Sequence, residues 1–320
     1  MRIWNNFTVL SQKTHLLLNP LAMTKKKVQT AITPAKLNRI IPKGKLLAIG
    51  GKEDKGEGQP DEKPENINFI SEQVLKRFVA ELRGDNPMVL VIPTASEIPE
   101  ESSQDYVTLF KELGVTNVQV ADIRNRPDAN LPEYLEMIKN AAGIMFTGGD
   151  QLRLTAIFGG SDALQAMKER YIYSNIIIAG TSAGAAAMST PMIYEGESQG
   201  GYIKGDVRMT TGLEFLKNVA IDTHFLTRGR IVRMTQAICT NPECIGIGLE
   251  EDTAILVTDG GKMEVVGSGL VTVVDGMGIT ESNIYEIENG QPFTAKGLRV
   301  HLLGNEDTYL IPAYERLQLQ

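Results

Sequence analysis

The chain of 320 residues carries a formal net charge of −7, and its composition, 42% hydrophobic and 22% charged, is typical of a globular protein. No apolar run approaches the roughly 20 residues that span a bilayer, so we expect no membrane partner. The charge is uneven, because residues 1–52 hold ten Lys/Arg and no Asp or Glu, whereas the remainder holds 22 basic and 39 acidic residues. Such an acidic body argues against a nucleic-acid partner.

Residues 1–42 lie outside the regular pattern that follows, and we expect a poorly ordered basic extension there. Its apolar run at 16–18 is short and is broken by Asn19 and Pro20, which is unlike a secretory signal. Met23 leaves open an alternative start. Residues 43–320 are expected to form a single α/β domain.

Two cysteines, Cys239 and Cys244, are too few for a disulfide framework, and their spacing has no second pair that would make a zinc site. We expect both to be small core residues in a reducing compartment, the cytoplasm. The glycine-rich stretch at 48–58 lacks both G-x-G-x-x-G and a P-loop lysine, so a nucleotide site has little support. No metal and no cofactor are expected.

From Lys45 onward, short apolar runs alternate with segments of helical periodicity. The predicted strands are 45–51, 88–93, 115–123, 142–147 and 176–181, and the predicted helices are 66–82, 106–113, 131–141, 152–158 and 163–171. This alternation predicts a mostly parallel, doubly wound sheet with helices on both faces. After Thr253 the pattern changes to antiparallel β-hairpins, at 254–258, 263–266, 271–274 and 298–303.

The five residues from Gly180 to Gly184 fit the G-x-S-x-G pattern of a nucleophile elbow centred on Ser182. A β-branched run precedes the motif and an Ala/Met run follows it, which is the strand–turn–helix context that the motif requires. The alternative is a tight turn whose small residues only let the helix pack close to the strand.

His224 is the best-placed base among three histidines. His15 lies in the extension, and His301 lies within an alternating strand pattern near the C-terminus. Because a serine nucleophile needs a base within hydrogen-bond reach, we interpret His224 as catalytic rather than structural.

Three consecutive carboxylates at 250–252 offer the acid that orients the base. Such a cluster is often a solvated turn, but a triad needs one carboxylate to hold the imidazole, and the residues alone leave open which one. The order Ser, His, acid differs from that of the α/β-hydrolases and disfavours that fold.

The stretch 147–151 (TGGDQ) follows a predicted strand and offers an oxyanion hole. Backbone N–H groups of Gly149 and of Ala183, the residue after the nucleophile, are the predicted donors. The alternative is a strand-exit turn in which Asp150 caps the next helix, and both can hold together.

Together these segments resemble the cyanophycinases, relatives of peptidase E (the α-aspartyl dipeptidases). The matching stretches are AIGGKED at 48–54, FTGGDQLRL at 146–154, GTSAGAAAMS at 180–189, the run D-x-H-F-x-x-R-x-R-x-x-R at 222–233 and GIGLEEDTAI at 246–255. The resemblance spans about residues 45–310 and implies a class I glutamine-amidotransferase-like, flavodoxin-like three-layer fold. It implies that Ser182 is the nucleophile, His224 the base and Glu251 the third triad member.

The resemblance also implies a substrate and the residues that contact it. A cytoplasmic, homodimeric serine-type exopeptidase would hydrolyse cyanophycin (multi-L-arginyl-poly-L-aspartate), or β-aspartyl-arginine oligopeptides, to β-Asp-Arg dipeptides through an acyl-enzyme. The substrate-contacting positions are Gln151, Asp222, Arg228, Arg230 and Arg233. Arginine forks suit substrate carboxylates, and Glu195, Glu197 or Asp222 could receive its guanidinium groups. The alternative is that these arginines form ion pairs with the surplus acids.

Thr223 departs from the family pattern, in which we expect Gln beside the aspartate, and this places a short hydroxyl at a position expected to bind substrate. Two other functions remain open. One is an aspartyl dipeptidase acting on Asp-X peptides, against which Gln151 and the arginines weigh. The other is a non-catalytic ligand-binding protein on the same fold, against which the intact Ser, His and Glu set weighs.

Overall fold

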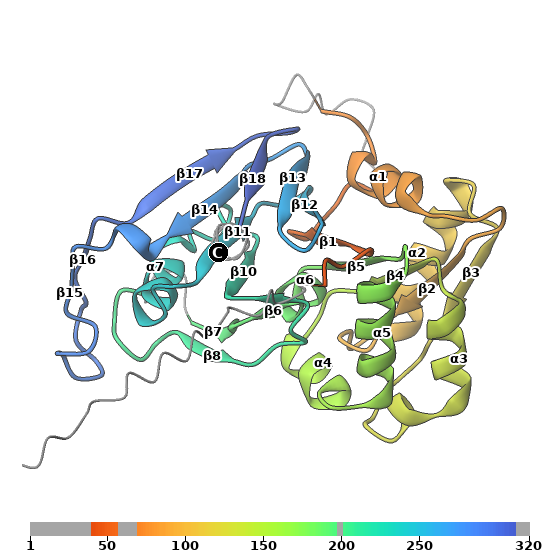
Figure 1. The fold of residues 1–320 in the computed structure, drawn as a ribbon, viewed down its shortest axis with the longest axis horizontal. Helices are drawn as coiled ribbons and strands as arrows, with labels where there is room; N and C mark the ends of the chain where they lie inside the picture. Colours follow the sequence, from red (N-terminus) through yellow and green to blue (C-terminus); the bar gives the residue numbers. More distant parts are fainter. Residues whose placement is uncertain (1–39, 57–68, 197–200, 312–320) are drawn as a thin grey trace, which may run out of the picture. The chain divides into compact units, whose positions relative to one another are not determined.

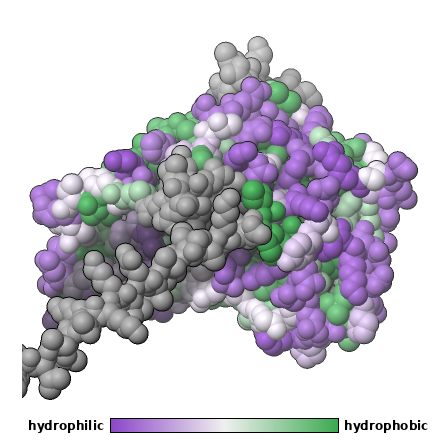
Figure 2. Space-filling model, viewed as in Figure 1, coloured by the Kyte–Doolittle hydropathy of each residue, from purple (hydrophilic) through white to green (hydrophobic). Residues whose placement is uncertain are grey.

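The computed structural model describes residues 40–56, 69–196 and 201–311, all of which belong to one compact unit, Ile40–Gln320. The extension expected at 1–42 lies almost wholly outside the described residues. No helix in the described part of the chain is long and apolar enough to cross a membrane. On the face shown in Figure 2, hydrophilic residues are interspersed with small apolar areas.

The larger of two main sheets has eight strands in the order β18-β13-β12-β1-β5-β4-β2-β3 (Figure 1). Strands β1, β5, β4, β2 and β3 pair in parallel, as the alternation of strands and helices predicts. The sheet continues through antiparallel pairs, β12 with β1, β13 with β12 and β18 with β13. Their bounds are β1 (Lys45–Ile49), β2 (Met88–Ile92), β3 (Asn117–Val120), β4 (Gly143–Phe146), β5 (Ile177–Thr181), β12 (Thr253–Thr258), β13 (Lys262–Gly267) and β18 (Thr308–Leu310).

Helices cover both faces of this larger sheet. On one face, α1 (Gln73–Glu81) and α2 (Pro99–Glu112) pack on alternate strand residues such as Leu47 and Val91. On the other face, the residues between them in sequence, such as Leu46 and Leu90, pack on three helices. These helices are α3 (Pro132–Asn140), α4 (Gln151–Phe158) and α5 (Asp162–Tyr173), with a 3₁₀ turn η1 (Asp128–Asn130) before α3. The chain is therefore a mixed α/β protein.

A smaller six-stranded sheet, in the order β17-β14-β11-β10-β6-β9, was not indicated by the sequence pattern. One face packs into the main core, and α7 (Ile231–Thr240) covers the other. Its strands are β6 (Ser189–Thr190), β9 (Leu216–Lys217), β10 (Val219–Thr223), β11 (Ile245–Leu249), β14 (Val271–Asp275) and β17 (Arg299–Leu303). The remaining elements are β7 (Met192–Glu195), β8 (Arg208–Thr210), η2 (Gly276–Gly278), β15 (Glu281–Ser282) and β16 (Ala295–Lys296). The expected hairpins therefore divide between two sheets instead of forming one antiparallel edge.

The short helix α6 (Ala183–Ala187) packs tightly between the strand before it and the smaller sheet. A Cβ atom on Gly180 would lie 2.5 Å from the carbonyl carbon of Gly184, and one on Gly184 would lie 2.8 Å from the carbonyl oxygen of Phe146. The small residues of the motif therefore do serve close packing, and this role does not exclude an elbow.

Two predicted elements are much shorter than expected. The helix predicted over 66–82 begins at Gln73, because Glu72 has a left-handed backbone (φ 56°), and residues 66–68 lie outside the described part. The strand predicted over 115–123 is limited to Asn117–Val120, since the N–H of Val115 bonds to the carbonyl of Phe110. Cys239 and Cys244 are free thiols and are 3% and 4% exposed.

Candidate active site

Ser182 occupies a strained turn between β5 and α6. Its φ of 49° and ψ of −109° lie in a region that residues with a side chain rarely adopt. Its N–H donates to the carbonyl of Ile49 at the end of β1, at 3.0 Å, which ties the turn to the neighbouring strand. The sharp change of direction leaves the Ser182 side chain partly exposed.

His224 follows β10 and lies within hydrogen-bond distance of Ser182, at 3.1 Å between Nε2 and the serine Oγ. Its backbone is also left-handed, with φ 48°, and its N–H donates to the carbonyl of Gly50 at 3.0 Å. Its Nδ1 lies 2.7 Å from Oε1 of Glu251. The imidazole therefore bridges the serine hydroxyl and a carboxylate, which is the arrangement that a nucleophile and its base require.

The three consecutive acids have three different partners. Glu251 contacts His224, and its carboxylate also lies 3.0 Å from the ammonium of Lys52. Glu250 accepts hydrogen bonds from the backbone N–H groups of Leu226 and Thr227 and from the Thr227 hydroxyl, so it holds the segment after the histidine. Asp252 accepts from the N–H of Asp54 and the hydroxyl of Ser268. Only Glu251 contacts the imidazole.

The electrostatic surroundings keep the imidazole neutral. Burial lowers the pKa of His224, and the nearby Arg228 and Arg230 lower it further, which outweighs the opposite effect of Glu251. For Glu251, burial raises the pKa, but the hydrogen bonds from His224 and Lys52 outweigh burial and the pKa is lowered. At neutral pH the pair is therefore a neutral imidazole beside an ionised carboxylate, and this imidazole can accept a proton.

The predicted oxyanion stretch lies beside the serine. A Cβ atom on Gly148 would lie 3.5 Å from the Cβ of Ser182. Gly149 has φ 138°, and a Cβ there would lie 2.1 Å from the carbonyl oxygen of Ala95, so only glycine fits. Asp150 caps α4 by accepting from the N–H of Leu152 at 2.8 Å, as the alternative interpretation predicts. Ala183 is the first residue of α6, where the N–H has no partner within the helix.

Asp222 and Arg233 form a buried ion pair. Asp222 is 3% exposed, and its carboxylate accepts from Nε of Arg233 at 2.6 Å and from Nη1 of Arg230 at 3.1 Å. Arg233 also donates to the carbonyl of Gly196 at 2.7 Å. The adjacent Thr223 is 4% exposed. The interpretation of the arginines as ion-pair partners of the acids therefore describes Arg233 well, and neither Asp222 nor Thr223 presents a free side chain to solvent.

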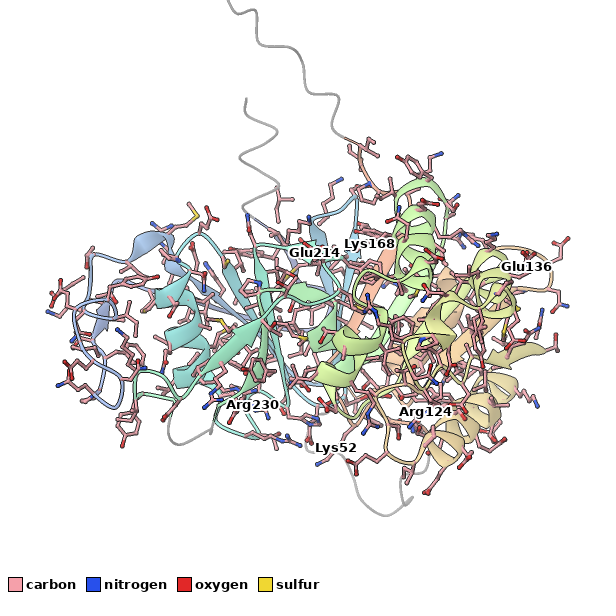
Figure 3. The ribbon with its side chains drawn as sticks, turned by 90° about the horizontal axis from the view of Figure 1, so that it is seen from below. Lys52, Arg124, Glu136, Lys168, Glu214 and Arg230 are labelled. Atoms are coloured by element: carbon pink, nitrogen blue, oxygen red, sulfur yellow. The ribbon has the colours of Figure 1, made fainter. Side chains whose placement is uncertain are left out.

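Arg230 and Arg233 nevertheless line an open cavity of about 630 Å³. Its other lining residues are Tyr194, Glu195, Gly196, Gly205, Asp206 and Arg208. Arg228 is exposed, and Gln151 is partly exposed and donates to the carbonyl of Ile193 at 3.2 Å. Figure 3 shows Lys52 and Arg230 at the same edge of the described unit. Glu197, a candidate acceptor for a guanidinium, lies outside the described residues.

Sequence reasoning missed Lys52 and the contact made by Gly50, both of which lie in the glycine-rich stretch after β1. The glycines at the end of this strand could have indicated that another part of the chain approaches the backbone closely, but they do not show which residue does so. In the part of the chain that the structure describes, no three His, Cys, Asp or Glu side chains are gathered so that they could hold a metal ion.

Residues 65–265 match the model of peptidase family S51, and the chain belongs to this family of serine-type peptidases. Two similar curated proteins are cyanophycinases. The one from Geminocystis herdmanii (strain PCC 6308) is 33% identical over 264 residues, which cover 82% of this chain and 92% of that protein. The one from Synechococcus elongatus is 33% identical over 273 residues, which cover 85% of this chain and 81% of that protein.

Among solved structures, a peptidase from an acI-B1 Actinobacterium matches 85% of this chain and 99% of its own length. The TM-score is 0.59 at 23% sequence identity, a level of similarity that shows a shared fold.

Proposed function

We propose that this peptidase hydrolyses cyanophycin from the chain end and releases β-Asp-Arg dipeptides, with Ser182, His224 and Glu251 as its catalytic triad. The observation that carries the proposal is the continuous chain of contacts from the serine hydroxyl through the imidazole to the carboxylate, at 3.1 and 2.7 Å. The similarity to two cyanophycinases supports the choice of substrate.

In this mechanism the Ser182 Oγ attacks the carbonyl carbon of a main-chain aspartyl peptide bond while His224 Nε2 takes the hydroxyl proton. Glu251 holds Nδ1 and stabilises the imidazolium that forms. Backbone N–H groups of Gly149 and Ala183 stabilise the developing oxyanion. The C–N bond then breaks as His224 protonates the leaving amine. A water molecule, deprotonated by the same imidazole, hydrolyses the resulting acyl-enzyme.

Substrate binding would use the cavity beside α7. The exposed Arg228 and the cavity-facing Arg230 would bind carboxylates of the substrate, and Gln151 would donate to a peptide carbonyl. Asp222 would not contact the substrate directly. Its buried carboxylate would instead fix the orientation of Arg230 and Arg233.

Incubation of the purified chain with cyanophycin, followed by mass spectrometry of the products, tests the proposal. We expect β-Asp-Arg from the wild type and a loss on the order of 10⁶ in kcat for Ser182→Ala. Asp-X dipeptides, tested in parallel, should be poor substrates. Cleavage of those dipeptides alone would favour the aspartyl dipeptidase alternative, and equal turnover by the Ser182→Ala variant would exclude Ser182 as the nucleophile.

A further inference from the structure

A buried carboxylate lies behind the elbow and has no part in the chemistry above. Glu53 follows β1 and is 6% exposed. Its Oε2 accepts the hydroxyl of Thr181 at 2.6 Å, and its Oε1 accepts the hydroxyl of Tyr106 from α2. The ammonium of Lys55 lies 4.6 Å from the centre of the Tyr106 ring.

In its contact with Glu53, the hydroxyl of Tyr106 can act only as the hydrogen-bond donor. Burial raises the pKa of Tyr106 well above its usual value, and the negative charge of Glu53 raises it further. The phenol therefore stays protonated and can only satisfy the carboxylate by donating to it. A buried carboxylate is costly unless hydrogen bonds compensate it, and the hydroxyls of Tyr106 and Thr181 supply two such bonds to Glu53.

The other residue that donates to Glu53, Thr181, is next to the proposed nucleophile. Thr181 is the last residue of β5 and is 5% exposed, and Ser182, with its strained backbone, follows it directly. A strained conformation persists only when its surroundings hold it in place. The anchors at this turn include the bond from the Ser182 N–H to Ile49, the bond from the Ala186 N–H to the Ser182 carbonyl, and the bond from the Thr181 hydroxyl to Glu53.

We propose that Glu53 is a positioning residue for Ser182, which acts by holding the Thr181 hydroxyl and so fixing the backbone from which the nucleophile projects. This inference rests on the proposed function of Ser182. The segment that carries Glu53 also reaches the other two triad members, because the Gly50 carbonyl accepts the N–H of His224 and Lys52 contacts Glu251. The turn after β1 is thus a common support for all three side chains.

Four variants separate positioning from mere stability. Thr181→Val removes the hydroxyl next to the elbow at similar shape, and Thr181→Ser keeps it. Glu53→Gln weakens both hydroxyl contacts. Tyr106→Phe is the matched control, because it removes the other hydroxyl from the same carboxylate and leaves the bond from Thr181 to Glu53 in place.

The readouts are kcat and KM on cyanophycin, the melting temperature, and the rate at which an aryl sulfonyl fluoride labels Ser182, followed by peptide mass spectrometry. For Thr181→Val and Glu53→Gln we expect kcat and the labelling rate to fall about 10- to 100-fold with KM within about 2-fold, since small misplacements of reacting groups have effects of this size. Thr181→Ser should stay within about 3-fold of the wild type. Tyr106→Phe should lower the melting temperature but keep kcat within about 3-fold.

Two results would overturn the inference while leaving the proposed function intact. One is a Thr181→Val enzyme with the kcat and labelling rate of the wild type. The other is a loss of kcat in Tyr106→Phe as large as that in Thr181→Val at an equal loss of melting temperature, which would show a structural role only. If the wild type neither cleaves cyanophycin nor reacts at Ser182, the proposed function fails first, and the inference fails with it.

Discussion

Gly51 lies directly against the imidazole of His224, so that a Cβ atom at this position would lie 2.5 Å from Cε1 and 2.6 Å from Nε2 of the ring. Gly51 also has φ 101°, a conformation that residues with side chains rarely adopt. The imidazole of the proposed base therefore fits at this place only because the turn after β1 has no side chain at position 51.

Gly51→Ala should lower kcat by at least 10-fold, because the new methyl group pushes the imidazole away from the Ser182 hydroxyl. Gly114→Ala is the control for backbone strain, since Gly114 has φ 89° but no atom within 4 Å of an added Cβ. Steady-state kinetics and melting temperatures of both variants provide the comparison. Equal losses of activity in the two would show that strain alone, and not displacement of the imidazole, is responsible.

Glu251→Gln should lower kcat, but less than Ser182→Ala or His224→Ala, because an orienting residue contributes less than a nucleophile or a base. The neighbouring Glu250 carries hydrogen bonds to Leu226 and Thr227 instead. Glu250→Gln should therefore mainly lower the melting temperature and leave the pH profile in place. If Glu250→Gln reduced kcat more than Glu251→Gln, the third triad member would be assigned one residue too late.

The pH dependence of kcat/KM should follow the protonation of His224. In the proposed mechanism, activity requires the neutral imidazole and is lost as pH falls through its pKa. Because burial lowers that pKa, the midpoint should lie below about 6.5. Arg228→Gln removes a positive charge that lowers this pKa, so the acidic limb should move to higher pH.

Arg126→Gln, which changes an exposed arginine that is not among the main influences on the pKa of His224, is the control for that measurement and should leave the limb in place. A limb that is unchanged in Arg228→Gln would argue against His224 as the group that titrates.

Asp222→Asn should destabilise the fold by about 3–5 kcal/mol, because it leaves Arg233 buried with no full counter-charge. The exposed pair of Glu195 and Arg208 offers the contrast, and Glu195→Gln should cost less than about 1 kcal/mol. Chemical denaturation of both variants gives the two free energies of unfolding. Similar values for the two would mean that the buried pair is much more hydrated than its burial indicates.

Thr223→Gln, which restores the amide that the family pattern leads us to expect, should destabilise by about 1–3 kcal/mol, because the position is 4% exposed and a larger side chain overpacks it. The ratio of kcat/KM on cyanophycin to that on short β-Asp-Arg oligomers should not change. A change in this ratio at unaltered melting temperature would show that position 223 faces the substrate after all.

The sequence predicted the larger sheet well because its signals are local. Each parallel strand is a short apolar run, and the helices between them show periodicity within one window. The smaller sheet depends on pairings between distant segments, such as β11 with β14, and β6 and β9 have two residues each, too few for any period. Three expectations stay predictions: the specific glutamine-amidotransferase-like fold, the homodimer, and the poor order of residues 1–42.

The sequence alone pointed to some residues of the candidate site more clearly than to others. Ser182 and His224 followed from residue type and motif, but the residues alone left three adjacent acids open, and the resemblance to a family chose Glu251. The side chains of the three acids point in different directions because the backbone turns at this segment, where Asp252 is left-handed (φ 49°). Residue propensities do not predict which of the three carboxylates then faces the imidazole. The contact of Lys52 with Glu251 is equally out of reach, because it joins residues 199 positions apart.

The three side chains come from different parts of the two sheets. Ser182 follows β5 of the larger sheet, His224 follows β10 of the smaller one, and Glu251 lies in the connection from β11 to β12, where the chain passes from one sheet to the other. A chain cut in the loop 201–207 would place the serine on one fragment and the histidine and glutamate on the other. If the proposed triad is correct, neither fragment can hydrolyse a peptide alone, so turnover would report the association of two separately expressed fragments.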